Sequence, residues 1–149
     1  MQVFRLCRQD EIKKILTQKS FADVGQTYQN NRELNSHNYR ENVKYLHFFK
    51  NKIDLLYLNT TVGRFVCTYD IPDKLLHQSA GQGKYKDYIA FKTLCQVDEY
   101  AIPVNDLKYE HLLAVNQIVK AFDFEDIHEN PREYFQTIYQ REKTQTRTL

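Results

Sequence analysis

The residues best suited to chemistry are three side chains that lie far apart in the chain, Arg5, His47 and Glu99. The planar guanidinium of Arg5 suits a phosphate or a diol. The imidazole of His47 can transfer a proton near neutral pH, and the carboxylate of Glu99 can stabilise a positive charge that develops during a reaction. The three residues are therefore candidates for one shared site, provided that the fold brings them together.

Each candidate also has an ordinary structural explanation. Arg5 shares a strand face with core-type residues, so it either forms a salt bridge with a neighbouring carboxylate or points into a cleft. His47 stands among aromatic residues, where an imidazole is commonly a packing residue. Glu99 follows Asp98 on a strand, so one of the two faces inward, but the period-two pattern does not decide whether Glu99 faces solvent or a cleft. The sequence leaves these alternatives open.

Alternating apolar residues predict the strands that carry these side chains, over residues 3–7, 45–49 and 95–103. The same pattern predicts three further elements, which are a strand at 64–71, an edge strand or extended segment at 85–91, and a strand or helix at 111–119. The order of these elements indicates an α+β fold.

Helices are predicted after the first two strands and after residues 64–71. The first helix runs through Gln18 and is capped by Gln9 or Asp10. The second follows Asn51 as its cap and buries three side chains, Ile53, Leu56 and Tyr57. The third is short and begins at Pro72. The stretch 43–58 thus places His47 where a strand leads directly into a helix.

Two loops stand out. Residues 22–42 are polar and longer than a connection requires, and the tyrosines within them, Tyr28 and Tyr39, favour an ordered loop that covers a ligand. The alternative is a surface helix over residues 31–40. Residues 79–83 predict a turn with glycines at positive φ, because the remainder of a phosphate-binding loop is missing.

Composition bounds the class of protein. A chain of 149 residues, with 42% hydrophobic and 27% charged residues, fits a single domain at residues 1–122, followed by an acidic segment and a packed helix at 123–149. No apolar run is long enough for a bilayer, and the first residues enter a strand pattern at once, so we expect a cytoplasmic protein without a signal peptide. The net charge of +2 permits a polyanionic partner without requiring one.

Cysteine and histidine spacing give no metal site. The three cysteines are far apart in apolar contexts, which predicts reduced core thiols, and the five histidines show no metal-ligand spacing. The unusual feature of the composition is its 11 tyrosines and 9 phenylalanines without tryptophan. Tyrosine can stack on a planar ligand, although it more often fills half-buried strand positions.

The layout resembles the ADP-ribosyltransferase-like fold, over about residues 1–119. The resemblance lies in Phe4-Arg5 with the helix that follows, in residues 44–49 with Leu55-Leu-Tyr-Leu58, and in residues 98–103. Similar layouts occur in DNA-modifying toxins of this fold and in RNA 2'-phosphotransferases. The resemblance implies a single α+β domain with twisted, mostly antiparallel sheets and short flanking helices.

The resemblance also implies a site for NAD as a substrate. Arg5 would hold the ribose or pyrophosphate, Tyr45 or His47 would line the nicotinamide pocket with Tyr57 as a further cofactor-binding candidate, and Glu99 would be the catalytic residue that bonds the ribose hydroxyl. The reaction would cleave the N-glycosidic bond through an oxocarbenium-like transition state.

Two departures from the family pattern restrict the acceptor. The central strand has no Ser-Thr-Ser, and Val97 stands where protein-modifying members have a second Glu or Gln. A nucleic acid or a small molecule is therefore the expected acceptor, unless the protein is inactive. The alternative function is a non-enzymatic module that binds nucleic acid or protein, supported by the interleaved lysines and tyrosines of residues 84–88. A ribonuclease that uses His47 with a lysine or tyrosine has no support in the spacing.

Overall fold

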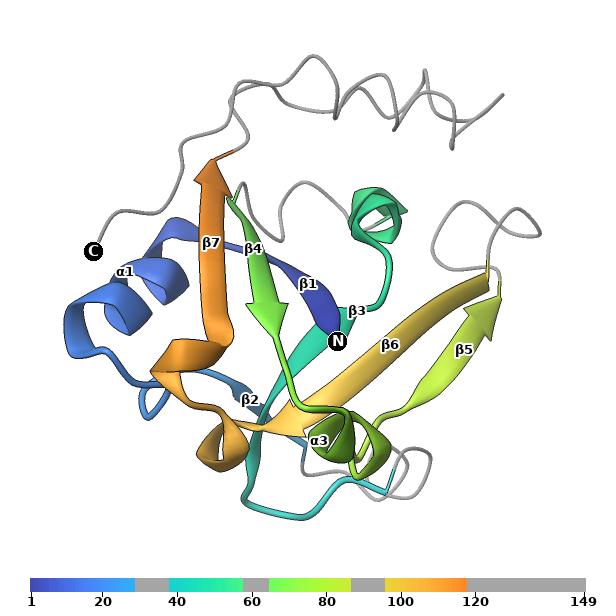
Figure 1. The fold of residues 1–149 in the computed structure, drawn as a ribbon. Coiled ribbons are helices and arrows are strands. Elements are labelled where there is room, and N and C mark those ends of the chain that lie inside the picture. The colour runs from blue at the N-terminus through green and yellow to red at the C-terminus, as the bar shows by residue number, and fades with distance from the viewer. Residues whose placement is uncertain (29–37, 58–64, 87–95, 118–149) are drawn as a thin grey trace.

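The structure, a computed structural model, describes residues 1–28, 38–57, 65–86 and 96–117. These residues form strands, two α-helices and short 3-10 helices (Figure 1). The strands are β1 (Gln2–Cys7), β2 (Gln26–Thr27), β3 (Lys44–Phe49), β4 (Phe65–Asp70), β5 (Gly83–Lys86), β6 (Gln96–Pro103) and β7 (Leu112–Gln117). The helices are α1 (Gln9–Gln18), α3 (Asp73–His77), η1 (Lys52–Tyr57), η3 (Val104–Asp106) and η4 (Tyr109–His111).

All of these strands belong to one antiparallel sheet with the order β5-β6-β3-β1-β4-β7, and β2 pairs with the beginning of β3. β1 pairs with β4 from Gln2 opposite Asp70 to Cys7 opposite Phe65, whereas its register with β3 is set by Phe4 opposite Phe49. Figure 1 shows that β4 and β7 run in a clearly different direction from β5 and β6. The sheet is therefore strongly twisted, as antiparallel sheets commonly are.

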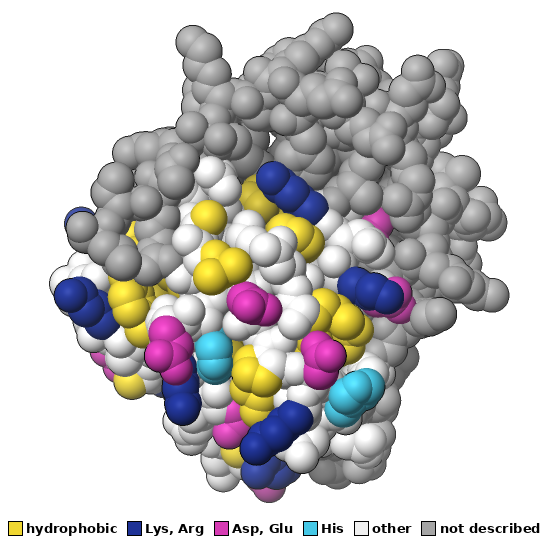
Figure 2. Space-filling model, viewed as in Figure 1, with side chains coloured by type: hydrophobic (Ala, Val, Ile, Leu, Met, Phe, Trp, Pro, Cys, Tyr) yellow, Lys and Arg dark blue, Asp and Glu magenta, His cyan; other side chains and the backbone are white. Residues whose placement is uncertain are grey.

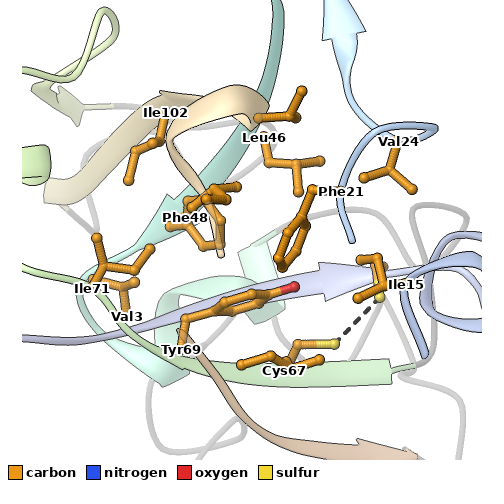
Figure 3. Close-up of a cluster of buried hydrophobic side chains, with 14 of the residues drawn as sticks. Val3, Ile15, Phe21, Val24, Leu46, Phe48, Cys67, Tyr69, Ile71 and Ile102 are labelled. Atoms are coloured by element: carbon orange, nitrogen blue, oxygen red, sulfur yellow. Dashed lines mark hydrogen bonds between the residues drawn. The ribbon is translucent and has the colours of Figure 1, made fainter. Parts of the chain in front are cut away.

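The main core lies between the two halves of this twisted sheet. Cys67 and Tyr69 of β4 face Leu46 and Phe48 of β3, and the rings of Phe48 and Tyr69 meet edge to face with centroids 4.8 Å apart (Figure 3). Ile15 of α1 is fully buried in the same cluster. Burial of each large apolar side chain stabilises the fold by about 1.5–3 kcal/mol.

Helix α1 ends as predicted, but its predicted cap is wrong. The N-cap is Arg8, whose backbone is extended and whose side chain makes no capping hydrogen bond. Asp10 lies instead in the first turn, where a negative charge favours the positive end of the helix dipole. Lys19 ends the helix in the left-handed conformation at φ 52°, and its backbone N–H donates to the carbonyl of Ile15.

The helix predicted after β3 is present as the 3-10 helix η1. Asn51 contributes its backbone carbonyl, which accepts a hydrogen bond of 3.1 Å from the N–H of Asp54. The side chains of Ile53, Leu56 and Tyr57, which were expected to be buried, lie outside the described part of the chain. Among the described side chains of η1, Asp54 and Leu55 are fully buried.

The remaining elements differ from the sequence pattern in two places. Strand β5 begins at Gly83, inside the turn predicted at residues 79–83, and residues 87–91 of the edge strand or extended segment predicted at 85–91 lie outside the described residues. Helix α3 begins after Pro72, and residues 112–117 form a strand and not a helix. The turn at residues 79–83 does not contain the positive-φ glycine. Among the described glycines that conformation belongs to Gly25, at φ 101°.

These observations confirm the predicted class, a small α+β domain with an antiparallel sheet and few helices. The acidic segment and helix expected at residues 123–149 and the surface helix considered at residues 31–40 fall wholly or largely outside the described residues. Within the described part of the chain, no helix has the length and apolar character needed to cross a membrane.

Candidate functional site

The candidate site is centred on a hydrogen-bonded pair of side chains, His47 of β3 and Glu99 of β6. The register of the two strands places His47 opposite Ala101 and Phe49 opposite Glu99, so the paired side chains are diagonal neighbours on one face of the sheet. Nδ1 of His47 lies 2.7 Å from Oε1 of Glu99. The side chains are 22% and 10% exposed, respectively, so the pair is held largely away from water.

The second ring nitrogen of His47 contacts two tyrosines. Tyr28 Oη is hydrogen-bonded to His47 Nε2, and Tyr39 Oη lies 3.3 Å from the same nitrogen. An ionised carboxylate only accepts hydrogen bonds, so Glu99 selects the tautomer that carries its proton on Nδ1. Nε2 of the neutral ring is then an acceptor, and a tyrosine hydroxyl donates to it.

The tyrosine rings form a compact aromatic group above the pair. Tyr28 and Tyr39 are stacked with centroids 4.0 Å apart and planes 9° apart. Tyr39 also meets the edge of Tyr45, at a centroid distance of 4.9 Å. Tyr45 is only 1% exposed, and its hydroxyl accepts a hydrogen bond of 2.8 Å from the backbone N–H of Arg40. Tyr45 therefore supports the group from below, whereas Tyr28 is its half-buried outer member.

Small residues make room for this group. Ala101 of β6 is fully buried against Tyr39 and Tyr45. A Cβ atom at Gly81 would lie 2.8 Å from Tyr39 Oη and 2.8 Å from the Cβ of Ala101, closer than atoms pack. Gly81 is thus required for close packing, which is a different role from the turn conformation predicted for it.

Arg5 does not join His47 and Glu99. In β1, Phe4 stands opposite Phe49 of β3, whose side chain lies on the same face of the sheet as that of His47. Neighbouring residues of a strand point to opposite faces, so Arg5 points to the other side of the sheet. There its guanidinium donates two hydrogen bonds to Glu11, of 2.9 and 2.6 Å, and a third of 3.1 Å to the backbone carbonyl of His47. The salt bridge considered as the structural alternative for Arg5 is therefore confirmed.

The charge on Arg5 is firmly held by this pairing. Burial disfavours the charged guanidinium, but the attraction of the Glu11 carboxylate and its hydrogen bonds outweigh that cost and raise the pKa of Arg5 above its usual value. With all of these donors engaged, Arg5 links α1 to β1 and to the backbone of β3.

The structure thus brings together His47, Glu99 and Tyr45 among the five predicted site residues. Arg5 lies on the opposite face, and the side chain of Tyr57 lies outside the described part of the chain. The sequence placed Tyr28 and Tyr39 in a loop expected to cover a ligand, but it did not predict their contacts with His47. Their signal was present, since they are aromatic residues within an otherwise polar segment.

Among the described residues, the pair has no metal-binding cluster beside it. Within the described ranges, no group of three or more His, Cys, Asp or Glu side chains gathers closely enough to hold a metal ion. The chemistry available here is that of a carboxylate, an imidazole and phenolic hydroxyls, which can accept, relay and donate protons.

Comparison of the chain with protein-family models gave no match, and neither did comparison with curated proteins or with solved structures. The class of the protein is therefore described by its fold and by the geometry of the site alone. The protein contains a small α+β domain whose twisted antiparallel sheet carries a largely buried His–Glu pair beneath stacked tyrosines.

Proposed function

We propose that the protein is an NAD-dependent ADP-ribosyltransferase-like enzyme that modifies a nucleic acid or a small molecule. The observation that carries the proposal is the His47–Glu99 pair, with a bond of 2.7 Å between the adjacent strands β3 and β6. The sequence resemblance to that fold depends on two features. One is an aromatic strand that leads into a helix, and the other is a later strand that carries a glutamate. We propose this fold family for the domain as well as the activity.

The Glu99 carboxylate suits the cleavage of an N-glycosidic bond. Nicotinamide leaves the ribose of NAD through an oxocarbenium-like transition state, in which positive charge develops on the sugar. A carboxylate fixed beside that charge lowers the barrier, and a site with little water strengthens the effect. His47 engages Oε1 of Glu99, so Oε2 can accept a hydrogen bond from a ribose hydroxyl.

The geometry changes the expected roles of the other residues. Tyr45 is too deeply buried to touch a ligand and supports Tyr39 and His47 instead. Tyr28 is half buried and takes the place of Tyr45 as the ring that a bound substrate can contact. Because Arg5 is engaged with Glu11, the pyrophosphate needs another cation. The exposed Arg40, next to Tyr39 in the chain, is the candidate among the described residues.

Thermal unfolding in the presence of NAD tests this arrangement. A ligand that binds only the folded state raises the melting temperature as its concentration increases. We expect such a rise for the wild-type protein, a smaller rise for Arg40→Ala, and the full rise for Lys13→Ala, which removes an exposed cation on α1. A melting temperature of the wild-type protein that does not change with NAD would contradict the proposal.

The competing function is a nucleic-acid-binding module that uses Lys84 and Lys86. These residues belong to β5 at the edge of the sheet, where they alternate with Tyr85, but their side chains lie outside the described part. On the face seen in Figure 2, the described lysines and arginines are interspersed with acidic side chains and do not form a basic stripe. Salt-sensitive binding of an oligonucleotide, lost on changing both lysines to alanine, would favour the module over the enzyme.

A further inference from the structure

His47 Nε2 has one lone pair in the ring plane, and two tyrosine hydroxyls approach it. Tyr28 makes the closer contact. Tyr39 lies 3.3 Å away, is 8% exposed, and has its hydroxyl packed against Gly81. Tyr28 is therefore the hydroxyl that donates to His47, and it is also the member of the group that is more open to solvent.

Glu99, His47 and Tyr28 form a continuous chain of hydrogen bonds from a largely buried carboxylate to the hydroxyl of a half-buried tyrosine. Glu99 holds the proton of the imidazole on Nδ1, so that Nε2 can accept the proton of Tyr28. A carboxylate, an imidazole and a hydroxyl in this order activate the hydroxyl in unrelated enzymes, because the carboxylate stabilises the imidazolium that forms. The arrangement is recognised by its geometry and not by its fold.

We infer that Tyr28 is the catalytic base that activates the acceptor, and that the acceptor is consequently a neutral O–H or N–H group. The inference rests on the proposed transfer from NAD. A neutral hydroxyl or ring N–H must lose a proton when it attacks, whereas an anionic acceptor such as a carboxylate needs no base. The relay is useful only for the first kind of acceptor, which includes nucleobase N–H groups, sugar hydroxyls and water.

The proton balance of the step is complete. The acceptor X–H attacks C1′ of the ribose as the bond from C1′ to nicotinamide breaks, and nicotinamide leaves as a neutral molecule with the bonding electron pair. The proton of X–H passes to Tyr28 Oη while the proton of Tyr28 passes to His47 Nε2. After this transfer Tyr28 is again a neutral hydroxyl, and Glu99 stabilises the resulting imidazolium, which returns His47 to its starting state by losing one proton to solvent. No oxidant or further co-reactant is required.

The test compares water with azide as the acceptor in the full-length Tyr28→Phe protein. The variant keeps the ring that stacks on Tyr39 and loses only the hydroxyl. Nicotinamide release from NAD in water should fall by about 100-fold or more, the usual contribution of a positioned base. Sodium azide is an anionic nucleophile and needs no base, so it should restore the rate of the variant at least tenfold and change the wild-type rate little.

A matched control is Tyr100→Phe, which removes a hydroxyl one residue from Glu99 on the core side of β6 and should keep the wild-type rate. If Tyr28→Phe is slow but azide does not restore it, the hydroxyl is structural and the inference is wrong. If Tyr28→Phe is as fast as the wild type, the inference is wrong while the proposed function stands. If the wild-type protein releases no nicotinamide, the proposed function fails and the role of Tyr28 fails with it.

Discussion

At the scale of single residues, two fully buried tyrosines differ in how their hydroxyls are satisfied. Tyr45 is 1% exposed and accepts a hydrogen bond from the backbone of Arg40. Tyr69 is 0% exposed, and within the described part of the chain its hydroxyl has no hydrogen-bond partner. A buried polar atom without a partner costs about 1–3 kcal/mol, whereas a typical hydrogen bond contributes about 1 kcal/mol.

The two tyrosines should therefore respond oppositely to loss of the hydroxyl. We predict that Tyr69→Phe raises the free energy of unfolding by roughly 1 kcal/mol and that Tyr45→Phe lowers it by a similar amount. Urea unfolding of the two variants and the wild-type protein measures both changes. A loss of stability in Tyr69→Phe equal to that in Tyr45→Phe would show that the Tyr69 hydroxyl is satisfied.

Residue types could identify part of the site but not its pairing. His47 and Glu99 are candidates from the sequence because His47 stands where a strand leads into a helix and Glu99 is a carboxylate on a late predicted strand. Their bond depends on the register between β3 and β6, which joins residues 52 positions apart. The sequence predicts Tyr28 only as part of a loop that covers a ligand, because no local pattern encodes its contact with His47.

At the scale of elements, the pair between Arg5 and Glu11 fixes α1 on the sheet. Both side chains are mostly buried, at 19% and 16% exposure, and the pair is bidentate. Loss of one partner from such a pair leaves a desolvated charge without its counter-charge. We predict that Glu11→Gln lowers the free energy of unfolding by roughly 2 kcal/mol.

Asp10→Asn is the control for this prediction. It removes an acidic charge from the same first turn of α1, but at an exposed position. Chemical unfolding of both variants should show a change of no more than about 0.5 kcal/mol for Asp10→Asn. Equal losses in the two variants would mean that the helix dipole, and not the pair with Arg5, accounts for the effect.

The positions of strands and helices could be predicted from the sequence more closely than the sheet faces on which their side chains lie. Alternation located β1, β3, β4 and β6, because strands with one buried face have a period of two. That Arg5 and the His47–Glu99 pair lie on opposite faces could not be predicted, since it depends on Phe4 standing opposite Phe49, 45 residues later in the chain. The cap of α1 was misplaced because Asp10 is an equally good residue for a first turn.

At the scale of the whole molecule, acid should weaken the fold through His111. Burial of His111, with a smaller contribution from Lys108, lowers the pKa of the imidazole below its usual 6.5 despite the opposing effect of Glu110. Nδ1 of His111 also accepts a hydrogen bond of 3.0 Å from the backbone N–H of Lys108, which requires the unprotonated ring. Below pH 6.5 the unfolded chain takes up a proton more readily than the folded one, so stability falls as the pH falls.

The variant His111→Asn measures this contribution, because asparagine keeps an acceptor for the Lys108 N–H and does not titrate. We predict that the wild-type protein loses more stability than the variant between about pH 7.5 and about pH 5.5. Thermal unfolding at the two pH values gives the comparison. An identical pH dependence in both proteins would contradict the assigned role of His111.

The overall class was predictable, but the strand order was not. An antiparallel α+β domain follows from short alternating strands joined by turns and short helices. The order β5-β6-β3-β1-β4-β7 brings β3 between β6 and β1 through contacts between distant parts of the chain. That order is what places His47 beside Glu99, so the site is a product of the whole fold.

The most direct measurement is nicotinamide release from NAD by the wild-type protein and by Glu99→Gln. The amide of glutamine can still accept a hydrogen bond from His47, so the substitution removes the charge and keeps the geometry. The proposed function predicts that the wild-type protein releases nicotinamide and that the rate in Glu99→Gln is lower by about 100-fold or more. The control variant Glu110→Gln changes an exposed carboxylate and should release nicotinamide at the wild-type rate. No release by the wild-type protein, or equal rates in the wild type and Glu99→Gln, would contradict the proposed function.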